Sequence, residues 1–237
     1  AYNEEPHLQA CLWALSEISC KYPVEIIGVD NDSKDRTAEI FRLSGIPYYT
    51  EYQHSCGYAR RCGLEHSRGK YYFDVDSDTL YPPQYYEVML EQLMRPGVSC
   101  ASATWSYFPD EGHSLLGLRL FEMVRDTFLW VQHFKRPELS VRGLVFAYNA
   151  DYGRKEPYRV DIIRGEDGSM ALSLKKYGKI RFVYDRRCCA ITGYGTIGQQ
   201  SMWKSFVDHV KTQTKGISRI FHKTDYYEDS EDNLVKR

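Results

Sequence analysis

Residues 70–78 read KYYFDVDSD, an apolar and aromatic run that passes directly into a cluster of aspartates. The run has the length and composition of a buried strand, so we expect a strand over residues 70–75. Asp76 and Asp78 follow it in a segment that resembles a turn. Two carboxylates at this spacing can share a hard divalent cation that also takes phosphate oxygens. For this motif alone, a solvated acidic turn without a ligand remains the alternative.

Strand and helix patterns alternate on both sides of this run. Strand patterns cover residues 24–30 and 46–51, and helical patterns cover 6–21, 33–43 and 57–66, with another from Pro82 to Met94. This alternation over the first 95 residues predicts βαβ units on a mostly parallel sheet flanked by helices. Ligands of such sheets bind beyond the carboxyl ends of the strands, where both Asp30 and residues 74–78 fall.

The second half of the chain is less regular. Strand patterns occupy residues 98–105, 141–150 and 180–184, and helical patterns occupy 115–131, 166–177 and 202–214. Glu166 and Asp167 stand at the start of one of these helices. There they can act simply as favourable first-turn charges, or one of them can serve as a general base.

Composition narrows the class of protein. The 237 residues carry 31 Lys and Arg against 32 Asp and Glu, a net charge of -1, so the chain has no general field for nucleic acid. No apolar run reaches the ~18 residues of a transmembrane helix. The seven cysteines are odd in number and form no CxxC pair, which argues against a zinc site or disulfide framework. We therefore expect a reducing, cytoplasmic setting.

Five segments in order resemble the family 2 glycosyltransferases of the GT-A fold: AYNEE (1–5), VDNDSKDRT (29–37), GYARRCGL (57–64), DSD (76–78) and GED (165–167). The likeness is strongest over residues 1–90 and 164–185. It implies a Rossmann-like α/β fold with a mixed, mostly parallel central sheet, whose first strand would precede Tyr2 and is missing from the chain. It also implies one domain over 1–237, with a nucleotide-sugar half (1–95), an acceptor half (96–200) and a C-terminal helix and acidic tail (201–237).

The resemblance also implies a role for each matching residue. Tyr2, Asn3 and Glu4 would lie under the nucleoside, Asp30 would bond the base, and Asp32 would lie near the ribose. Arg60 would face the phosphates or the sugar. Asp76 and Asp78 would hold the nucleotide and Mg²⁺ or Mn²⁺, with Asp78 nearer the metal. Asp167 would deprotonate the acceptor hydroxyl, and Glu166 would shape the acceptor site.

The implied activity is inverting transfer of a hexose-type sugar from a nucleoside diphosphate to a hydroxyl of a glycan or lipid-linked acceptor. UDP is the first candidate for the donor nucleotide. Bacterial surface polysaccharide or glycolipid assembly is the expected context. Two departures from the family pattern matter. Asn31 stands where many members carry a second Asp, and Met202 replaces the Arg of the QxxRW element of processive synthases, which favours addition of a single sugar.

Alternatives remain open at this point. A catalytically silent nucleotide-sugar-binding module would need no base at Asp167. A nucleotidyltransferase would normally need a glycine-rich, basic phosphate loop, and the given sequence contains none. The basic stretch 204–223 could lie on an anionic membrane at the cytoplasmic, inner face, or it could be a helix that closes the domain.

Overall fold

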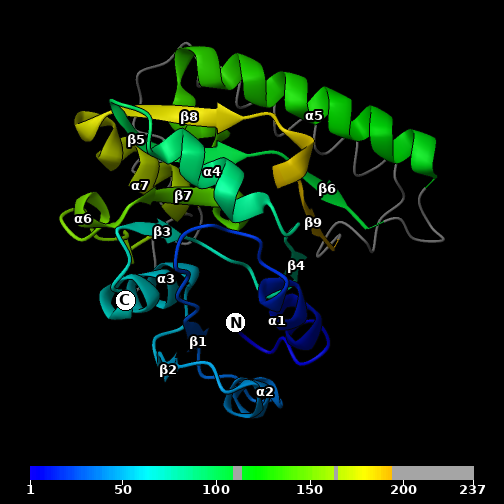
Figure 1. Cartoon of the computed structure of the whole chain (residues 1–237), viewed down its shortest axis with the longest axis vertical. Coiled ribbons are helices and arrows are strands. Elements are labelled where there is room, and N and C mark those ends of the chain that lie inside the picture. Colours follow the sequence, from blue (N-terminus) through cyan, green and yellow to red (C-terminus); the bar gives the residue numbers. More distant parts are fainter. Residues whose placement is uncertain (109–113, 163–164, 194–237) are drawn as a thin grey trace.

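The computed structural model describes residues 1–108, 114–162 and 165–193. The helix expected at 202–214 and the acidic tail lie outside these residues. Figure 1 shows the arrangement of the elements. The helices are α1 (Leu8–Ser16), α2 (Thr37–Ser44), α3 (Cys56–His66), α4 (Tyr85–Leu93), α5 (Leu115–Lys135), α6 (Ala150–Gly153) and α7 (Glu166–Leu174). The strands are β1 (Gly28–Asp30), β2 (Tyr48–Thr50), β3 (Tyr71–Phe73), β4 (Thr79–Leu80), β5 (Val98–Ala103), β6 (Trp105–Tyr107), β7 (Phe146–Asn149), β8 (Lys179–Val183) and β9 (Ala190–Thr192).

The strands form a two-stranded sheet β1-β2, a four-stranded sheet β3-β7-β5-β8 and a three-stranded sheet β4-β9-β6. The mixed α/β class expected from the sequence is confirmed. The detail that the pairings are mostly parallel is wrong for the described strands. The parallel pairs β1-β2, β5-β8 and β6-β9 are matched in number by the antiparallel pairs β3-β7, β5-β7 and β4-β9.

The path of the chain before β7 explains this difference. After α5, the 3-10 turns Pro137–Ser140 and Gly143–Val145 return the chain to the carboxyl end of β3, where Asp74 N donates to Phe146 O. β7 therefore enters between β3 and β5 in the opposite direction to both. The strand pattern in the sequence does not show whether the strand runs parallel or antiparallel to its neighbours.

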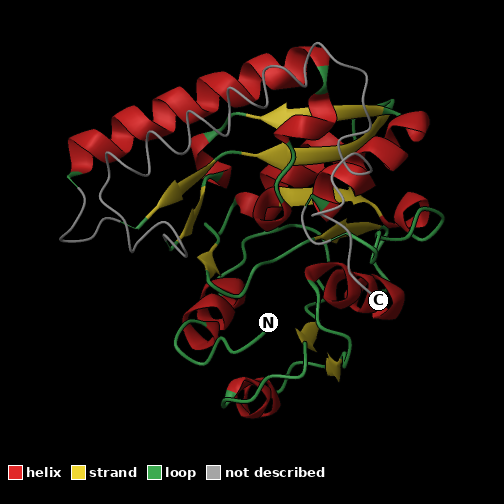
Figure 2. Cartoon of the chain, turned by 180° about the vertical axis from the view of Figure 1, so that it is seen from behind, coloured by secondary structure: helices red, strands yellow, loops and turns green. Residues whose placement is uncertain are grey.

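Helices cover both faces of the four-stranded sheet, as the opposite views of Figures 1 and 2 show. α4 packs on β5, β7 and β8, and α7 packs against β5 from the other side. Alternate residues of the segment entering and forming β7 join different cores: Val145 and Ala147 lie with Met89 of α4, whereas Phe146 and Tyr148 lie with α7. The strand is therefore buried on both faces.

β1 belongs to the two-stranded sheet, which is separate from the four-stranded sheet. The predicted strand at 24–30 is confined to Gly28–Asp30, because no described strand pairs with residues 24–27. On the edge away from β2, the Ala1 amino group donates to Val29 O (2.7 Å), and Ala1 O accepts from Asn31 N (2.8 Å). Ala1 thus pairs with β1 in the manner of a parallel strand. The first strand expected before Tyr2 stays a prediction.

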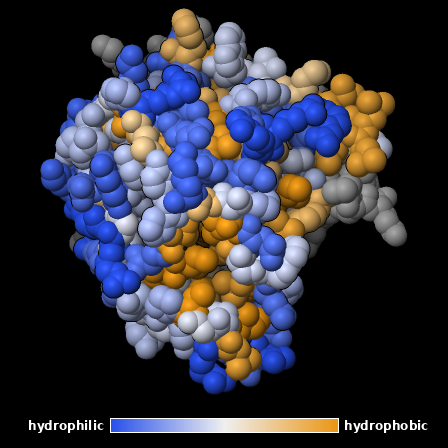
Figure 3. Space-filling view, in the orientation of Figure 1, coloured by the Kyte–Doolittle hydropathy of each residue, from blue (hydrophilic) through white to orange (hydrophobic). Residues whose placement is uncertain are grey.

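A groove of about 860 Å³ opens beside Ala1, lined by α1, residues 22–29 and residues 69–78. Figure 3 shows apolar residues gathered on this face of the molecule. The α2 helix ends where the sequence predicts, at Gly45, whose φ of 74° is a left-handed conformation that favours glycine. None of the helices in the described ranges is both long and apolar enough to cross a bilayer.

Candidate active site

Arg60 lies at the centre of a cluster of carboxylates. It projects from the second turn of α3, a helix whose N-cap Ser55 accepts a hydrogen bond from Tyr58 N. Its Nη1 donates to Glu166 Oε1 (2.6 Å) and to Asp167, and its Nη2 donates to Asp76 Oδ1 (3.1 Å). Only 14% of the Arg60 side chain is exposed. Four residues predicted from three separate motifs therefore share one guanidinium contact network.

Asp167 is held from two sides in the first turn of α7. One carboxylate oxygen contacts Arg60, and Oδ2 accepts from Gly143 N (2.8 Å). Burial raises the pKa of Asp167 to about 6, with Arg60 opposing the rise and Glu166 adding to it. A carboxylate with a pKa in this range can accept a proton near neutral pH and later release it.

Gly143 allows the close approach of the 3-10 turn to Arg60. A Cβ atom at this position would overlap the guanidinium of Arg60. The same residue supplies the N–H that fixes Asp167. Nothing in the sequence distinguishes Gly143 from the other glycines, so its place at the site becomes evident only in the folded chain.

Asp76 and Asp78 lie in the turn after β3. Asp76 N donates to Tyr81 Oη (3.0 Å), and Asp78 Oδ1 accepts from Thr79 Oγ1 (3.1 Å). Burial, followed by repulsion from Asp76, raises the pKa of Asp78. A bound cation would relieve both effects.

The described residues contain no group of three or more side chains placed to hold a metal ion. Mg²⁺ and similar cations bind through one or two carboxylates when phosphate oxygens and water complete the shell. The pair Asp76 and Asp78 therefore fits a cation that shares its shell with a diphosphate.

A third aspartate of the same run, Asp74, is buried beneath the cluster. Tyr158 Oη donates to its Oδ2, while Oδ1 makes no hydrogen bond and lies 3.9 Å from Arg60 Nε. Burial raises the pKa of Asp74 to about 8. The sequence places Asp74 at the strand end. Packing decides that Asp74 is the aspartate of the run that faces inward, and that Tyr158 is its partner.

The segment at residues 2–5 is joined to the turn after β1. Asn3 N donates to Ser33 Oγ (2.9 Å), Lys34 N donates to Asn3 Oδ1 (2.7 Å), and Glu4 N donates to Thr37 Oγ1 (2.8 Å). Asn3 and Asp32, with φ of 54° and 58°, are the non-glycine residues with positive φ in the described chain. Backbone strain of this kind concentrates at functional sites.

Two predicted nucleoside residues in this turn differ in exposure. Asp30 is only 3% exposed, and its Oδ1 accepts from Ser33 N (3.2 Å). Asp32 is more open, and its Oδ2 contacts Lys34 Nζ (2.7 Å) and His54 Nε2 (3.3 Å). Asp30 thus holds the turn in this structure.

The groove brings part of the predicted set onto one surface. Tyr2, Glu4, Arg60, Asp76 and Asp78 line it. Asn3, Asp30, Asp32, Glu166 and Asp167 are not among its lining residues, although Glu166 and Asp167 contact Arg60 directly.

Comparison with solved structures identifies proteins of the same fold. The mannosyltransferase PcManGT from Pyrobaculum calidifontis, in complex with GDP-Man and Mn²⁺, is 17% identical with a TM-score of 0.63, over 81% of this chain and 54% of that one. S. aureus TarS 1-349 with UDP-GlcNAc is 14% identical with a TM-score of 0.56, over 81% and 56% of the two chains.

Glucosyl-3-phosphoglycerate synthase from Mycobacterium tuberculosis, with Mn²⁺, UDP and glucosyl-3-phosphoglycerate, is 17% identical with a TM-score of 0.57, over 90% of this chain and 77% of that one. The chain spans little more than half the length of the first two proteins. At these identities the likeness establishes the fold, which is that of the GT-A glycosyltransferases.

The sequence itself gives the family. No match is found among the curated proteins. The profile of "Glycosyl transferase family 2" matches residues 1–150, which contain α1 to β7 and the Arg60, Asp76 and Asp78 part of the cluster. The resemblance seen in the sequence motifs is thereby confirmed, and the chain belongs to glycosyl transferase family 2.

Proposed function

We propose that this protein is an inverting, metal-dependent glycosyltransferase. It moves a hexose-type sugar from a nucleoside diphosphate to a hydroxyl acceptor, with UDP as the first candidate for the donor nucleotide. The observation that carries the proposal is the shared contact of Arg60 with Asp76 and Asp167. The Arg60 guanidinium links two carboxylates. Asp76 is suited to bind a metal–diphosphate group, and Asp167 is suited to general-base catalysis. A module that only bound nucleotide sugars would have no use for a carboxylate with a raised pKa at Asp167.

Asp167 is the residue to which we assign proton transfer. The acceptor hydroxyl gives its proton to Asp167 as its oxygen attacks the anomeric carbon of the sugar. The bond from that carbon to the diphosphate oxygen breaks, and the electron pair leaves with the nucleoside diphosphate. A single displacement of this kind inverts the anomeric centre. The Gly143 N–H and Arg60 fix the Asp167 carboxylate during the transfer.

Asp76 and Asp78 are the residues to which we assign Mg²⁺ or Mn²⁺. The cation, when bound, neutralises the charge that develops on the departing diphosphate. Mn²⁺ accompanies GDP-Man in the Pyrobaculum structure and UDP in the mycobacterial one, which supports a divalent metal here. Glu166 would shape the acceptor site, and Arg60 holds the groove residue Asp76 next to Glu166.

We extend the proposal to the setting of the reaction. The acceptor would be a glycan or lipid-linked hydroxyl in bacterial surface polysaccharide or glycolipid assembly, and one sugar would be added per encounter. The protein would act in the cytoplasm, with peripheral contact at the inner face of the membrane. The replacement of Arg by Met202 supports addition of a single sugar.

Calorimetric titration of UDP, GDP and dTDP, each with and without Mn²⁺, tests the core of the proposal. We expect one diphosphate to bind in a metal-dependent manner, and Asp78→Ala to remove that dependence. Binding with the same metal dependence in Asp78→Ala would contradict the assigned metal site. Absence of binding for all three would contradict the proposed donor class.

A further inference from the structure

Helix α5 turns a row of apolar side chains towards solvent. The row follows one face of the helix and consists of Leu116, Leu120, Met123, Trp130 and Phe134, which together are called the α5 face. Trp130 is 65% exposed and Phe134 is 82% exposed. A helix that only covers a core buries its apolar side and exposes its polar side. Packing against this core therefore does not account for the α5 face.

Buried polar contacts fix this orientation of α5. Glu122 is buried and accepts hydrogen bonds from Ser106 Oγ and from Tyr107 N (3.3 Å) in β6. Arg125 is also buried, donates to Trp105 O, and lies 4.2 Å from the centroid of the Trp105 ring. Rotation of the helix to bury its apolar row would break these contacts. The outward position of the row is therefore a consequence of the fold.

The exposed charges of α5 are all basic. Arg119 near the start of the helix and Lys135 at its end are exposed. The acids of α5 are Glu122 and Asp126, and their side chains are only 9% and 15% exposed. Aromatic and aliphatic side chains flanked by basic ones are typical of helices that lie on an anionic membrane surface.

We infer that the α5 face docks on an anionic phospholipid bilayer, with Trp130 and Phe134 entering the interfacial region of the lipid. The inference rests on the proposed function, because it names the surface that makes the membrane contact included there. It assigns this contact to α5 and not to the basic stretch 204–223. Burial of the exposed apolar side chains drives docking, and the basic side chains add attraction to anionic lipid.

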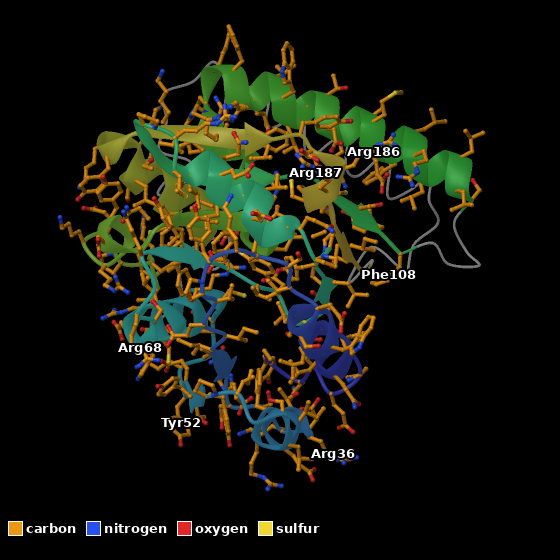
Figure 4. All side chains as sticks on the ribbon, in the orientation of Figure 1. Arg36, Tyr52, Arg68, Phe108, Arg186 and Arg187 are labelled. Carbon is orange, nitrogen blue, oxygen red and sulfur yellow. The ribbon has the colours of Figure 1, made fainter. Side chains whose placement is uncertain are left out.

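The position of α5 suits such a contact. The helix lies along the outer edge of the molecule in Figure 1, and Figure 4 shows side chains extending outward along its length. No residue of α5, which is described in full, lines the groove. After α5, two 3-10 turns carry the chain to Gly143, whose N–H binds Asp167. Docking therefore leaves the groove open and ties the docked helix to the residue assigned to the acceptor.

Charge disfavours two other occupants of the α5 face. In an antiparallel pair of α5 helices centred on Thr127, Arg119 would lie opposite Lys135 of the second copy, because both are equally distant from Thr127. Like charges placed together in this way oppose association. The stretch 204–223 carries five Lys and Arg against one Asp, so it offers no complementary charge either. An anionic bilayer does.

Flotation of the full chain with lipid vesicles tests the inference. We expect binding to vesicles of phosphatidylcholine and phosphatidylglycerol, and weaker binding to phosphatidylcholine alone. Trp130→Ser should weaken binding to the anionic vesicles about tenfold. Trp13→Ser is the matched control, because Trp13 is also 65% exposed but is the one exposed large apolar residue of α1. Its binding should equal that of the wild type.

A second pair of variants tests the electrostatic attraction. Arg119 and Arg36 have side chains that are 73% and 67% exposed, and each pairs with a glutamate three positions later. Arg36 lies at the opposite end of the molecule from α5, as Figures 1 and 4 show. Arg119→Gln should weaken binding to anionic vesicles about fivefold, whereas Arg36→Gln should leave it unchanged. Equal effects of the two substitutions would contradict docking through α5.

Trp130→Phe separates insertion of this side chain from binding, since it keeps an apolar ring. Tryptophan emission of the wild type should shift to shorter wavelength when anionic vesicles are added. Trp130→Phe should still bind but lose most of this shift. A shift that persists in the variant would assign insertion to another tryptophan, such as Trp203 before the basic stretch, and would overturn the inference.

The remaining outcomes are also decisive, once thermal unfolding shows that each variant is folded. Wild-type protein that ignores anionic vesicles, or Trp130→Ser that binds them normally, would overturn the inference. A dimer that Trp130→Ser dissociates in analytical ultracentrifugation would assign the α5 face to a second copy and overturn it as well. Calorimetry of nucleoside diphosphate and Mn²⁺ without vesicles reports on the proposed function separately. Failure there would overturn the donor class and leave the vesicle result standing.

Discussion

Arg60 and Asp167 are 107 positions apart in the chain, and an ion pair joins them. Arg60 belongs to α3 in the first half of the chain, and Asp167 belongs to α7 in the second half. The same guanidinium binds Asp76 and Glu166 and lies 3.9 Å from Asp74. Four carboxyl groups from two halves of the chain thus surround the single guanidinium of Arg60.

Removal of Arg60 should destabilise the fold strongly. Arg60→Met leaves neighbouring carboxylates without their shared partner, and breaking a buried ion pair in this way typically costs about 3–5 kcal/mol. The free energy of unfolding, measured in urea, should fall by that amount. Arg61→Met is the matched control, because Arg61 is 44% exposed and pairs with Glu65 on the helix surface. Its loss should cost less than about 0.5 kcal/mol, and equal losses for the two variants would refute the central role of Arg60.

Replacement of Asp167 by Asn should separate turnover from binding. Asn retains an oxygen that can accept from Gly143 N but cannot take a proton from an acceptor hydroxyl. We expect kcat to fall at least about 100-fold, with the affinity for nucleoside diphosphate and Mn²⁺ nearly unchanged. Steady-state kinetics and calorimetry measure the two quantities. A parallel loss of affinity and turnover would assign Asp167 to binding instead.

The pH dependence of catalysis should report Asp167. Its pKa is raised to about 6, and a general base must be unprotonated to act. The value of kcat/KM should therefore rise with pH through about 6 and level off above it. Initial rates from about pH 5 to pH 8 provide the measurement. The residual activity of Asp167→Asn should lack this rise, and a rise that persists in the variant would point to another titrating group.

Asp74 should make the fold less stable as pH rises. Burial raises its pKa from the ordinary range to about 8, so the folded state holds a proton that the unfolded chain releases near pH 4. Between these values, each pH unit removes up to roughly 1.4 kcal/mol from the free energy of unfolding. Asp74→Asn cannot ionise and should lose less stability from pH 6 to pH 8. Identical pH profiles of melting temperature in the two proteins would contradict the buried, protonated state of Asp74.

Gly143→Ala should displace Arg60 by direct overlap. The added Cβ would occupy space that the guanidinium fills, so we expect both stability and turnover to fall. Measured as a double-mutant cycle, the stability loss should shrink in an Arg60→Ala background, which removes the clashing group. Additive effects of the two substitutions would show that Gly143 matters for a reason other than Arg60.

The sequence by itself determined several of the elements and the chemistry at their ends. Apolar runs that pass into aspartates predicted β1 and β3 and their acidic ends at Asp30 and at residues 74–78, because strand pattern and turn chemistry are local properties. Gly45 ended α2, and Glu166 and Asp167 began α7, for the same reason. The five motifs in order also gave the family, which the profile match confirmed.

Only the tertiary structure decided which of these groups meet. The direction of β7, the inward position of Asp74 against Tyr158, the approach of Gly143 to Arg60, and the outward apolar face of α5 depend on how distant segments pack. Periodicity reports which face of an element is apolar, but not which side chain lies opposite it across the domain. Arg60 and Asp167 were each marked by a motif, but only the folded chain brings α3 and α7 close enough for their ion pair.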